Sequence, residues 1–169
     1  MHWTHNGYLI RPSRLEDAED YYHSLFSPLD PEAARLTGSP YHFPKETVLS
    51  FFKRCIADET RHDFLILDPS GCIIGESVIN EYDPQTNSAN YRIFLSGSHN
   101  RDRGIGTWAV RTACAFAFEE INLTRLTLSV YDFNPRAIHV YEKCGFESIG
   151  REDNELLMEL THHKWLSRR

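Results

Sequence analysis

The sequence predicts an α/β (α+β) fold in which a mixed, largely antiparallel central sheet carries helices on both faces. Three alternating, strand-like segments joined by short turns lie between residues 63 and 96, as in an antiparallel meander. After residue 100, helical and strand-like patterns alternate, which is typical of strands connected by covering helices. The chain has 169 residues, of which 41% are hydrophobic, so we expect one core and a single domain over residues 1–169.

The first half of the chain predicts one strand and two amphipathic helices before the meander. Residues 8–12 are expected to form a short strand, and Ser13 and Glu16 have the spacing of a capping box that begins a helix. The apolar residues of this helix recur at helical spacing at Leu15, Ala18, Tyr22 and Leu25. Residues 27–44 are rich in Pro and Gly and predict a loop around a short helical piece. A second helix is indicated by an apolar stripe at Val48, Phe51, Phe52, Cys55 and Ile56.

The second half of the chain completes the sheet around two further helices. The expected strands of the meander are 63–67, 72–79 and 89–96. Helices are expected at 104–120 and 134–144, and the remaining strands at 123–131, 146–151 and 156–161. We expect the adjacent His162 and His163 to lie in a strand as well, and therefore to point to opposite faces.

Composition and charge narrow the kind of partner. The net charge of −6 provides no basic surface for nucleic acid or an anionic membrane, and favours a cationic or neutral small molecule. The four cysteines form no CxxC pair and the histidines lack the spacing of metal ligands, so we predict no metal site. No signal peptide or membrane-spanning apolar run is evident, so we expect a cytoplasmic protein, either monomer or homodimer.

A glycine loop, Arg101–Gly106, lies just before a predicted helix. Backbone N–H groups at a helix start converge on an anion, and glycine lets that anion approach closely. Arg101 and Arg103 add positive charge, which suits a pyrophosphate or a phosphorylated ribose. The two glycines and Ala109 also satisfy the G-x-G-x-x-A dinucleotide fingerprint, although that motif should open a doubly wound parallel sheet. An ordinary helix start is the third interpretation.

A second motif, Asn134–Phe146, has every mark of a complete short helix. Asparagine is at the N-cap, proline at the first helical position and glycine just past the end. Asn134, Ala137 and Tyr141 fall on one stripe, so they either address a common groove or belong to the core face.

Together and in this order, the two motifs resemble the GNAT superfamily of N-acetyltransferases. The R/Q-x-x-G-x-G/A loop of that family is matched by Arg101, Gly104 and Gly106. Its N-x-x-A-x-x-x-Y-x-x-x-G-F segment is matched by Asn134, Ala137, Tyr141, Gly145 and Phe146. The opening Ile10-Arg11-Pro12 resembles the branch that includes ribosomal-protein N-terminal and spermidine acetyltransferases. The expected element order agrees too, so the resemblance covers nearly the whole chain.

The resemblance implies an acetyl-CoA-dependent N-acetyltransferase. The acetyl group would pass directly from acetyl-CoA, a co-substrate, to a primary amine of a protein N-terminus, a polyamine or another small molecule. Tyr141 would protonate the departing thiolate. The cofactor-binding residues implied are Phe94, Leu95 and Ser96 for the pantetheine arm, Arg101, Asp102, Arg103, Gly104, Ile105, Gly106 and Thr107 for the pyrophosphate, and Asn134, Ala137 and Tyr141 nearby. The alternatives are a non-catalytic CoA-binding sensor module and a nucleotide-binding oxidoreductase.

The reaction also needs a group that takes a proton from the amine, because a lysine-like amine has a pKa of about 10.4. Glu76 and Glu81 lie on the strand expected to face the acceptor groove, so they are the candidate bases, directly or through water. They are five residues apart and point to opposite faces, so at most one of them lines the groove. The alternative is that both are solvated carboxylates on a strand surface.

Overall fold

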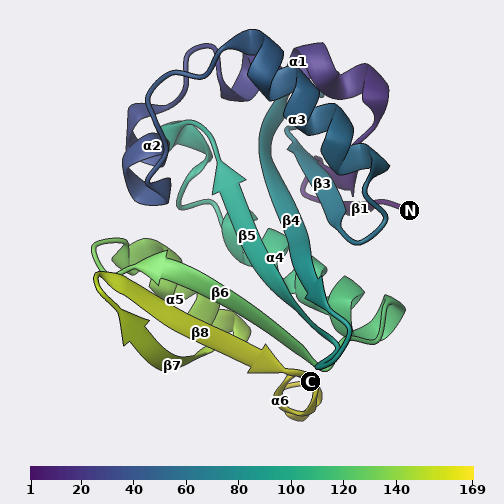
Figure 1. The fold of residues 1–169 in the computed structure, drawn as a ribbon, viewed down its shortest axis with the longest axis vertical. Coiled ribbons are helices and arrows are strands. Elements are labelled where there is room, and N and C mark those ends of the chain that lie inside the picture. The colour runs from purple at the N-terminus through teal and green to yellow at the C-terminus, as the bar shows by residue number, and fades with distance from the viewer.

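The computed structural model describes residues 1–169, and it confirms a mixed sheet with helices on both faces (Figure 1). Eight strands form one sheet in the order β1-β2-β3-β4-β5-β6-β8-β7. The strands are β1 (Trp3–His5), β2 (Tyr8–Pro12), β3 (His62–Leu67), β4 (Ile73–Asp83), β5 (Ser88–Leu95), β6 (Arg125–Tyr131), β7 (Glu147–Glu152) and β8 (Glu155–Thr161). The helices are α1 (Ala18–Leu25), α2 (Pro31–Thr37), α3 (Lys45–Ala57), α4 (Ile105–Ala115), α5 (Pro135–Cys144) and α6 (His162–Ser167).

Two apolar clusters hold helices to the opposite faces of this sheet. On one face, α1 and α3 bury Leu25 and Phe52 against Leu65 and other side chains of β3. On the other face, α4 and α5 pack on the larger cluster, which includes Tyr91 of β5 and Leu128 of β6. Burying apolar area on both faces is what stabilises a sheet between two helical layers.

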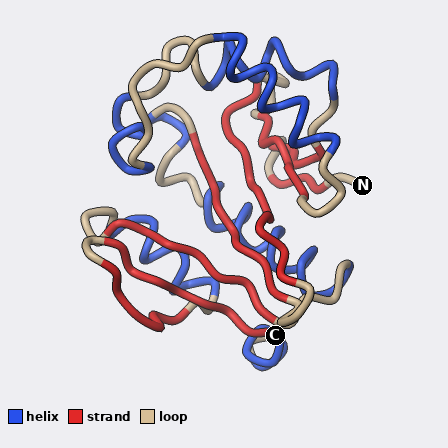
Figure 2. The backbone as a smooth tube through the Cα atoms, viewed as in Figure 1, coloured by secondary structure: helices blue, strands red, loops and turns tan.

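The strands β5 and β6 are paired only where they begin. They are parallel and in register from Ser88↔Arg125 to Asn90↔Thr127, and β5 continues to Leu95 without a partner on that side. A bulge in β4 between Asn80 and Asp83 lies beside these last paired residues, and bulges increase the local twist of a sheet. The two strands then diverge into a V, and α2 lies near its open end (Figure 2). The sheet therefore has an internal unpaired edge.

The expected capping box at Ser13 and Glu16 is wrong, because the residues that form it are Arg14 and Asp17. The carboxylate of Asp17 accepts the N–H of Arg14 at 2.8 Å and both terminal nitrogens of Arg11 at 2.7 Å. The helix consequently begins at Ala18 after a single 3-10 turn. Tyr21, at 3% exposure, is buried in place of the expected Tyr22.

The C-terminal histidines also differ from the prediction. His162 and His163 begin α6 and do not continue the last strand, because the Thr161 hydroxyl caps the new helix by accepting the N–H of Lys164 at 3.2 Å. The strand β1 was not expected. None of the helices is both long enough and apolar enough to cross a membrane.

Candidate functional site

One cavity of about 870 Å³ lies between β5 and β6 and extends beneath α1 and α3. We name its two sides after the helices that cover them. The α4–α5 side is lined by Leu95, Asp102, Gly104, Gly106, Thr107, Asn134, Arg136, Ala137 and Tyr141. The α1–α3 side is lined by Tyr21, Phe26, Phe43, Thr47, Phe51, Arg54, Glu76, Arg92 and Phe94. Residues of α2, such as Ala33 and Leu36, line it between these sides.

The start of α4 offers a row of free donors to the α4–α5 side. The N–H groups from Arg103 to Thr107 donate to no acceptor within the protein, as expected for a first helical turn without a capping side chain. Gly104 is the N-cap with φ of 77°, a conformation that favours glycine. A Cβ built on Gly104 or Gly106 would meet no heavy atom within 4 Å, so the space before the donors is open. This arrangement suits an anion.

We expected Arg101 to face this open space, but its side chain turns away toward α2. Its guanidinium donates to Oδ2 of Asp30 at 2.8 Å, and both side chains are nearly buried, at 13% and 15% exposure. The same oxygen accepts the N–H of Gly97 at 2.9 Å, while Oδ1 caps α2 through the N–H of Glu32 at 2.9 Å. Burial opposes ionisation of Asp30, but the Gly97 donor and the Arg101 charge outweigh it and lower its pKa. Arg101 therefore anchors the glycine loop to α2.

A different arginine stands beside the donors, and sequence reasoning missed it. Arg136 lines the α4–α5 side and lies 3.0 Å from the carboxylate of Asp102, with 53% of its side chain exposed. It occupies the first turn of α5, where the helix dipole disfavours a cation. A cation at this unfavourable position is a sequence signal for an anion-binding site, because a bound anion would offset the cost.

The free edge of β5 differs by one residue from the expectation. Ser96 donates its N–H to Ile74 at 2.8 Å, and its carbonyl accepts the side-chain amide of Asn100 at 2.9 Å, so both of its backbone groups are engaged. Backbone groups in an antiparallel pair alternate between the two sides of a strand, so Phe94 also faces β4. The N–H and C=O groups of Ile93 and Leu95 point instead into the gap. Of the three expected residues only Leu95 has this orientation, and Ile93 was missed.

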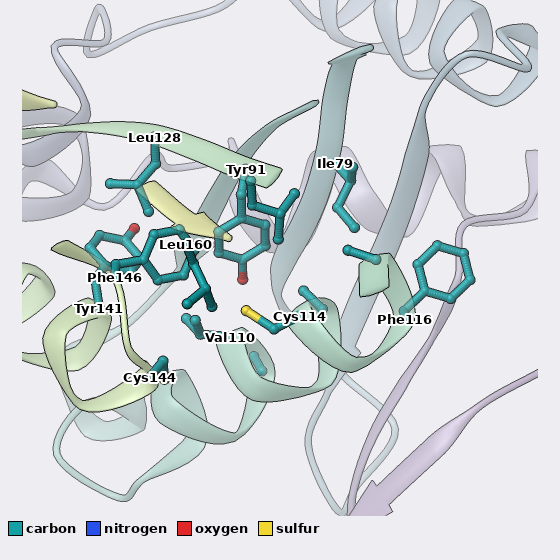
Figure 3. Close-up of a cluster of buried hydrophobic side chains, with 14 of the residues drawn as sticks. Ile79, Tyr91, Val110, Cys114, Phe116, Leu128, Tyr141, Cys144, Phe146 and Leu160 are labelled. Carbon is teal, nitrogen blue, oxygen red and sulfur yellow. The ribbon is translucent and has the colours of Figure 1, made fainter. Parts of the chain in front are cut away.

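The second motif places two polar groups on the cavity wall. Asn134 caps α5 by accepting the N–H of Ala137 on Oδ1 at 3.2 Å, which leaves its NH₂ group without a partner. Tyr141, only 6% exposed, packs edge-on to Phe146 and also lines the cavity. Its hydroxyl has no hydrogen-bond partner in the protein and points toward the strand that carries Leu128 (Figure 3). Burial raises the pKa of Tyr141 well above its ordinary value, so the phenol keeps its proton at neutral pH.

The two candidate bases lie in different environments. Glu76 is 8% exposed and lines the α1–α3 side, where it accepts the Tyr21 hydroxyl at 2.8 Å and a guanidinium nitrogen of Arg92 at 3.3 Å. Burial and the charge of Glu76 raise the pKa of Tyr21, which keeps it a donor to this carboxylate. Glu81 lies in the β4 bulge with φ of 52°, exposed and outside the cavity lining. Of these two carboxylates, Glu76 is the one that lines the cavity.

The structure offers neither a reactive cysteine nor a cluster of metal ligands at this cavity. Cys144 is 3% exposed at the end of α5, and burial raises the pKa of its thiol, so it is protonated and poorly nucleophilic. No group of three or more His, Cys, Asp or Glu residues is arranged to hold a metal ion.

Comparisons with known proteins agree with this geometry. Residues 8–147 match the family model described as the acetyltransferase (GNAT) domain, so the chain belongs to the GNAT acetyltransferase family. The predicted class of activity, acetyl transfer from acetyl-CoA to an amine, is confirmed by this membership.

Several relatives carry more specific names. A spermidine N(1)-acetyltransferase of Vibrio cholerae is 28% identical over 99 residues, which span 59% of this chain and 57% of that protein. The enzyme of the same name from Escherichia coli K12 is 27% identical over 88% of this chain and 77% of its own length. Among solved structures, a spermidine N-acetyltransferase from Vibrio cholerae in complex with CoA and spermine superposes with a TM-score of 0.81 at 19% identity, covering 96% of this chain and 99% of that one. A ribosomal-protein-S5-alanine acetyltransferase from Vibrio fischeri has a TM-score of 0.81 at 16% identity and 98% coverage of both chains, so these two structures share the fold.

Proposed function

We propose that this chain, acting as one catalytic unit over residues 1–169, acetylates a small primary amine. Acetyl-CoA occupies the α4–α5 side of the cavity and the amine occupies the α1–α3 side. The observation that carries this proposal is a single cavity, through a gap in the sheet, that joins the free N–H donors of α4 to the buried carboxylate of Glu76. Its two sides are lined by different chemistry, as two substrates require.

The α4–α5 side fits the parts of acetyl-CoA in order. The N–H groups of residues 103–107 bind the pyrophosphate, assisted by the positive charge of Arg136. The free backbone groups of Ile93 and Leu95 pair with the amides of the pantetheine arm as an added strand would. The unpartnered NH₂ of Asn134 donates to a carbonyl of the same arm. Arg101 acts indirectly, by holding the loop in place through Asp30.

The chemistry is direct transfer with two proton movements. Acetyl-CoA supplies the thioester, whose carbonyl carbon bonds to the amine nitrogen as the C–S bond breaks. Glu76 accepts the proton that the amine loses, directly or through water. Tyr141 donates its proton to the sulfur as negative charge develops there, which its raised pKa allows because the proton is still present at neutral pH.

The relatives are named for more than one kind of acceptor amine. The curated relatives are named for spermidine, and the Vibrio fischeri structure for an alanine of a ribosomal protein. Polyamines and peptide N-termini are therefore the first acceptor amines to test. Cytoplasmic location, the absence of nucleic-acid and membrane partners, and a monomer or homodimer all stay predictions; one Vibrio cholerae spermidine N-acetyltransferase structure is dodecameric.

The test is release of free CoA thiol when the protein is mixed with acetyl-CoA and a panel of amines. We expect thiol release that depends on the amine, and stabilisation of the fold by acetyl-CoA but not by NAD. Stabilisation by acetyl-CoA, with no release of CoA thiol in the presence of any amine, would favour the non-catalytic sensor module. Stabilisation by NAD alone would favour the oxidoreductase.

A further inference from the structure

The α1–α3 side of the cavity contains an excess of positive charge. The charged lining residues on α3, β4 and β5 are Arg54, Glu76 and Arg92, so two guanidiniums face one carboxylate here. The other charged lining residues lie on the glycine loop, α5 and β8: Arg101, Asp102, Arg136, Lys143 and Glu155. Arg54 forms no ion pair and is exposed to the cavity. Arg92 touches Glu76 through one nitrogen at 3.3 Å and keeps 46% of its side chain exposed. Glu76 carries one negative charge and already faces Arg92, so it leaves the charge of Arg54 unbalanced.

The two arginines approach this space from opposite walls. On α3, Arg54 lies seven residues after Thr47 and three residues after Phe51. At this spacing the three side chains share the face of the helix that lines the cavity. Arg92 lies on β5 opposite Val78 of β4, on the same face of the sheet as Glu76. A molecule between the helix and the sheet is therefore within reach of guanidiniums from both.

The rest of this side is aromatic. Phe26 and Phe43 meet edge to face with ring centroids 5.5 Å apart, and Phe51 and Phe94 line the same space. Phe51 is 39% exposed although it is a large apolar side chain on a helix that faces the cavity. Such walls bind an apolar body, while arginine pairs favour a planar anion that can accept parallel hydrogen bonds.

We propose that the acceptor is a primary amine with an apolar body and a carboxylate, of the amino-acid type, and that Arg54 and Arg92 bind the carboxylate. This inference rests on the proposed function and gives its acceptor a chemical class. A polyamine would bring two or more ammonium groups against two arginines and one already bonded carboxylate. The local charge of the pocket thus opposes the cationic or neutral acceptor that the net charge of the chain favours.

The experiment compares two acceptors that differ only by a carboxylate, phenylalanine and 2-phenylethylamine, with spermidine as the polyamine. We expect kcat/KM for phenylalanine to exceed that for 2-phenylethylamine by about 10-fold or more, since hydrogen bonds between oppositely charged groups are stronger than those between neutral groups. Arg54→Gln and Arg92→Gln should each remove most of this preference through KM while the affinity for acetyl-CoA stays unchanged. The matched control is Arg35→Gln, which removes an arginine of α2 outside the cavity lining and should keep the preference.

Equal or better use of spermidine or 2-phenylethylamine by the unmodified protein would overturn the inference, as would a preference that survives both arginine substitutions. Binding of phenylalanine in the presence of CoA, measured by calorimetry, separates this inference from the proposed function. Binding that is lost in both arginine variants, without turnover of any amine, would support the carboxylate site and refute the transferase. No binding of phenylalanine would refute the site whether or not another amine is acetylated.

Discussion

Asp30 provides the sharpest test of how the cofactor loop is held, because one carboxylate joins three parts of the chain. Oδ1 caps α2, and Oδ2 accepts both the Gly97 N–H and the Arg101 guanidinium. Asp30→Asn keeps an oxygen for the cap but removes the charge opposite Arg101. Asp30→Ala removes both, so the pair of variants separates the cap from the ion pair.

The expected losses follow from these contacts. A hydrogen bond to a charged group contributes about 1.5–3 kcal/mol, so Asp30→Asn should lower the free energy of unfolding by about 2 kcal/mol. Loss of an N-cap costs about 1 kcal/mol more, so Asp30→Ala should lower it by about 3 kcal/mol. Arg101 is only 13% exposed and is left unpaired in both variants. The matched control is Glu32→Gln, which breaks an exposed pair with Arg35 and should leave the free energy of unfolding almost unchanged.

The assay is denaturant unfolding over a range of pH, together with acetyl-CoA titration. The pKa of Asp30 is lowered in the folded state, so its contribution is complete above the unfolded pKa of about 3.9 and is lost as the pH falls through the folded value. The gap between wild type and Asp30→Asn should therefore be constant near neutral pH and shrink in acid. Both variants should also bind acetyl-CoA more weakly, because the Gly97–Gly104 loop loses its anchor. Wild-type stability in Asp30→Ala, or a gap that widens as the pH falls, would refute this account.

Three further substitutions test the roles of single residues. Gly104→Glu should abolish acetyl-CoA binding in calorimetry, because its carboxylate enters the space that the phosphates occupy. The control Gly104→Ala has the same backbone strain without the charge and should retain part of the affinity. Normal binding by Gly104→Glu would show that the loop is not part of the site. Tyr141→Phe should lower kcat by about 100-fold or more with nearly unchanged affinity for acetyl-CoA, and an unaltered kcat in a steady-state assay would end its role as the acid. Glu76→Gln should lower kcat by a similar factor while Glu81→Gln does not, and equal effects of the two would contradict the assignment of the base.

Most of the fold follows from local patterns in the sequence. The meander, α4 with its glycine loop, and α5 with its Asn134 cap and Gly145 end have signals that depend only on near neighbours. The burial of Tyr21 does not, because Tyr21 and Tyr22 are both at helical spacing from Leu25, and the hydroxyl of Tyr21 donates to Glu76, 55 positions away in the sequence.

The site was predictable where one motif makes it and not where distant segments meet. The free donors of residues 103–107 and the cap at Asn134 follow from their own helices. The bond between Arg101 and Asp30 joins residues 71 positions apart, and no periodicity reveals it. The same holds for Arg54 and Arg92, which lie on a helix and a strand that the fold places around one cavity.

The central claim is that acetyl-CoA lies in the gap between β5 and β6 with its pyrophosphate at the start of α4. Amide hydrogen exchange with and without acetyl-CoA measures this directly, because the relevant N–H groups donate to nothing in the free protein. We predict that acetyl-CoA slows exchange in two places, at Ile93 and Leu95 of β5 and in residues 103–107, while β1 and β7 at the outer edges of the sheet are unaffected. Unchanged exchange in both segments at saturating acetyl-CoA, or protection confined to another part of the chain, would contradict the account.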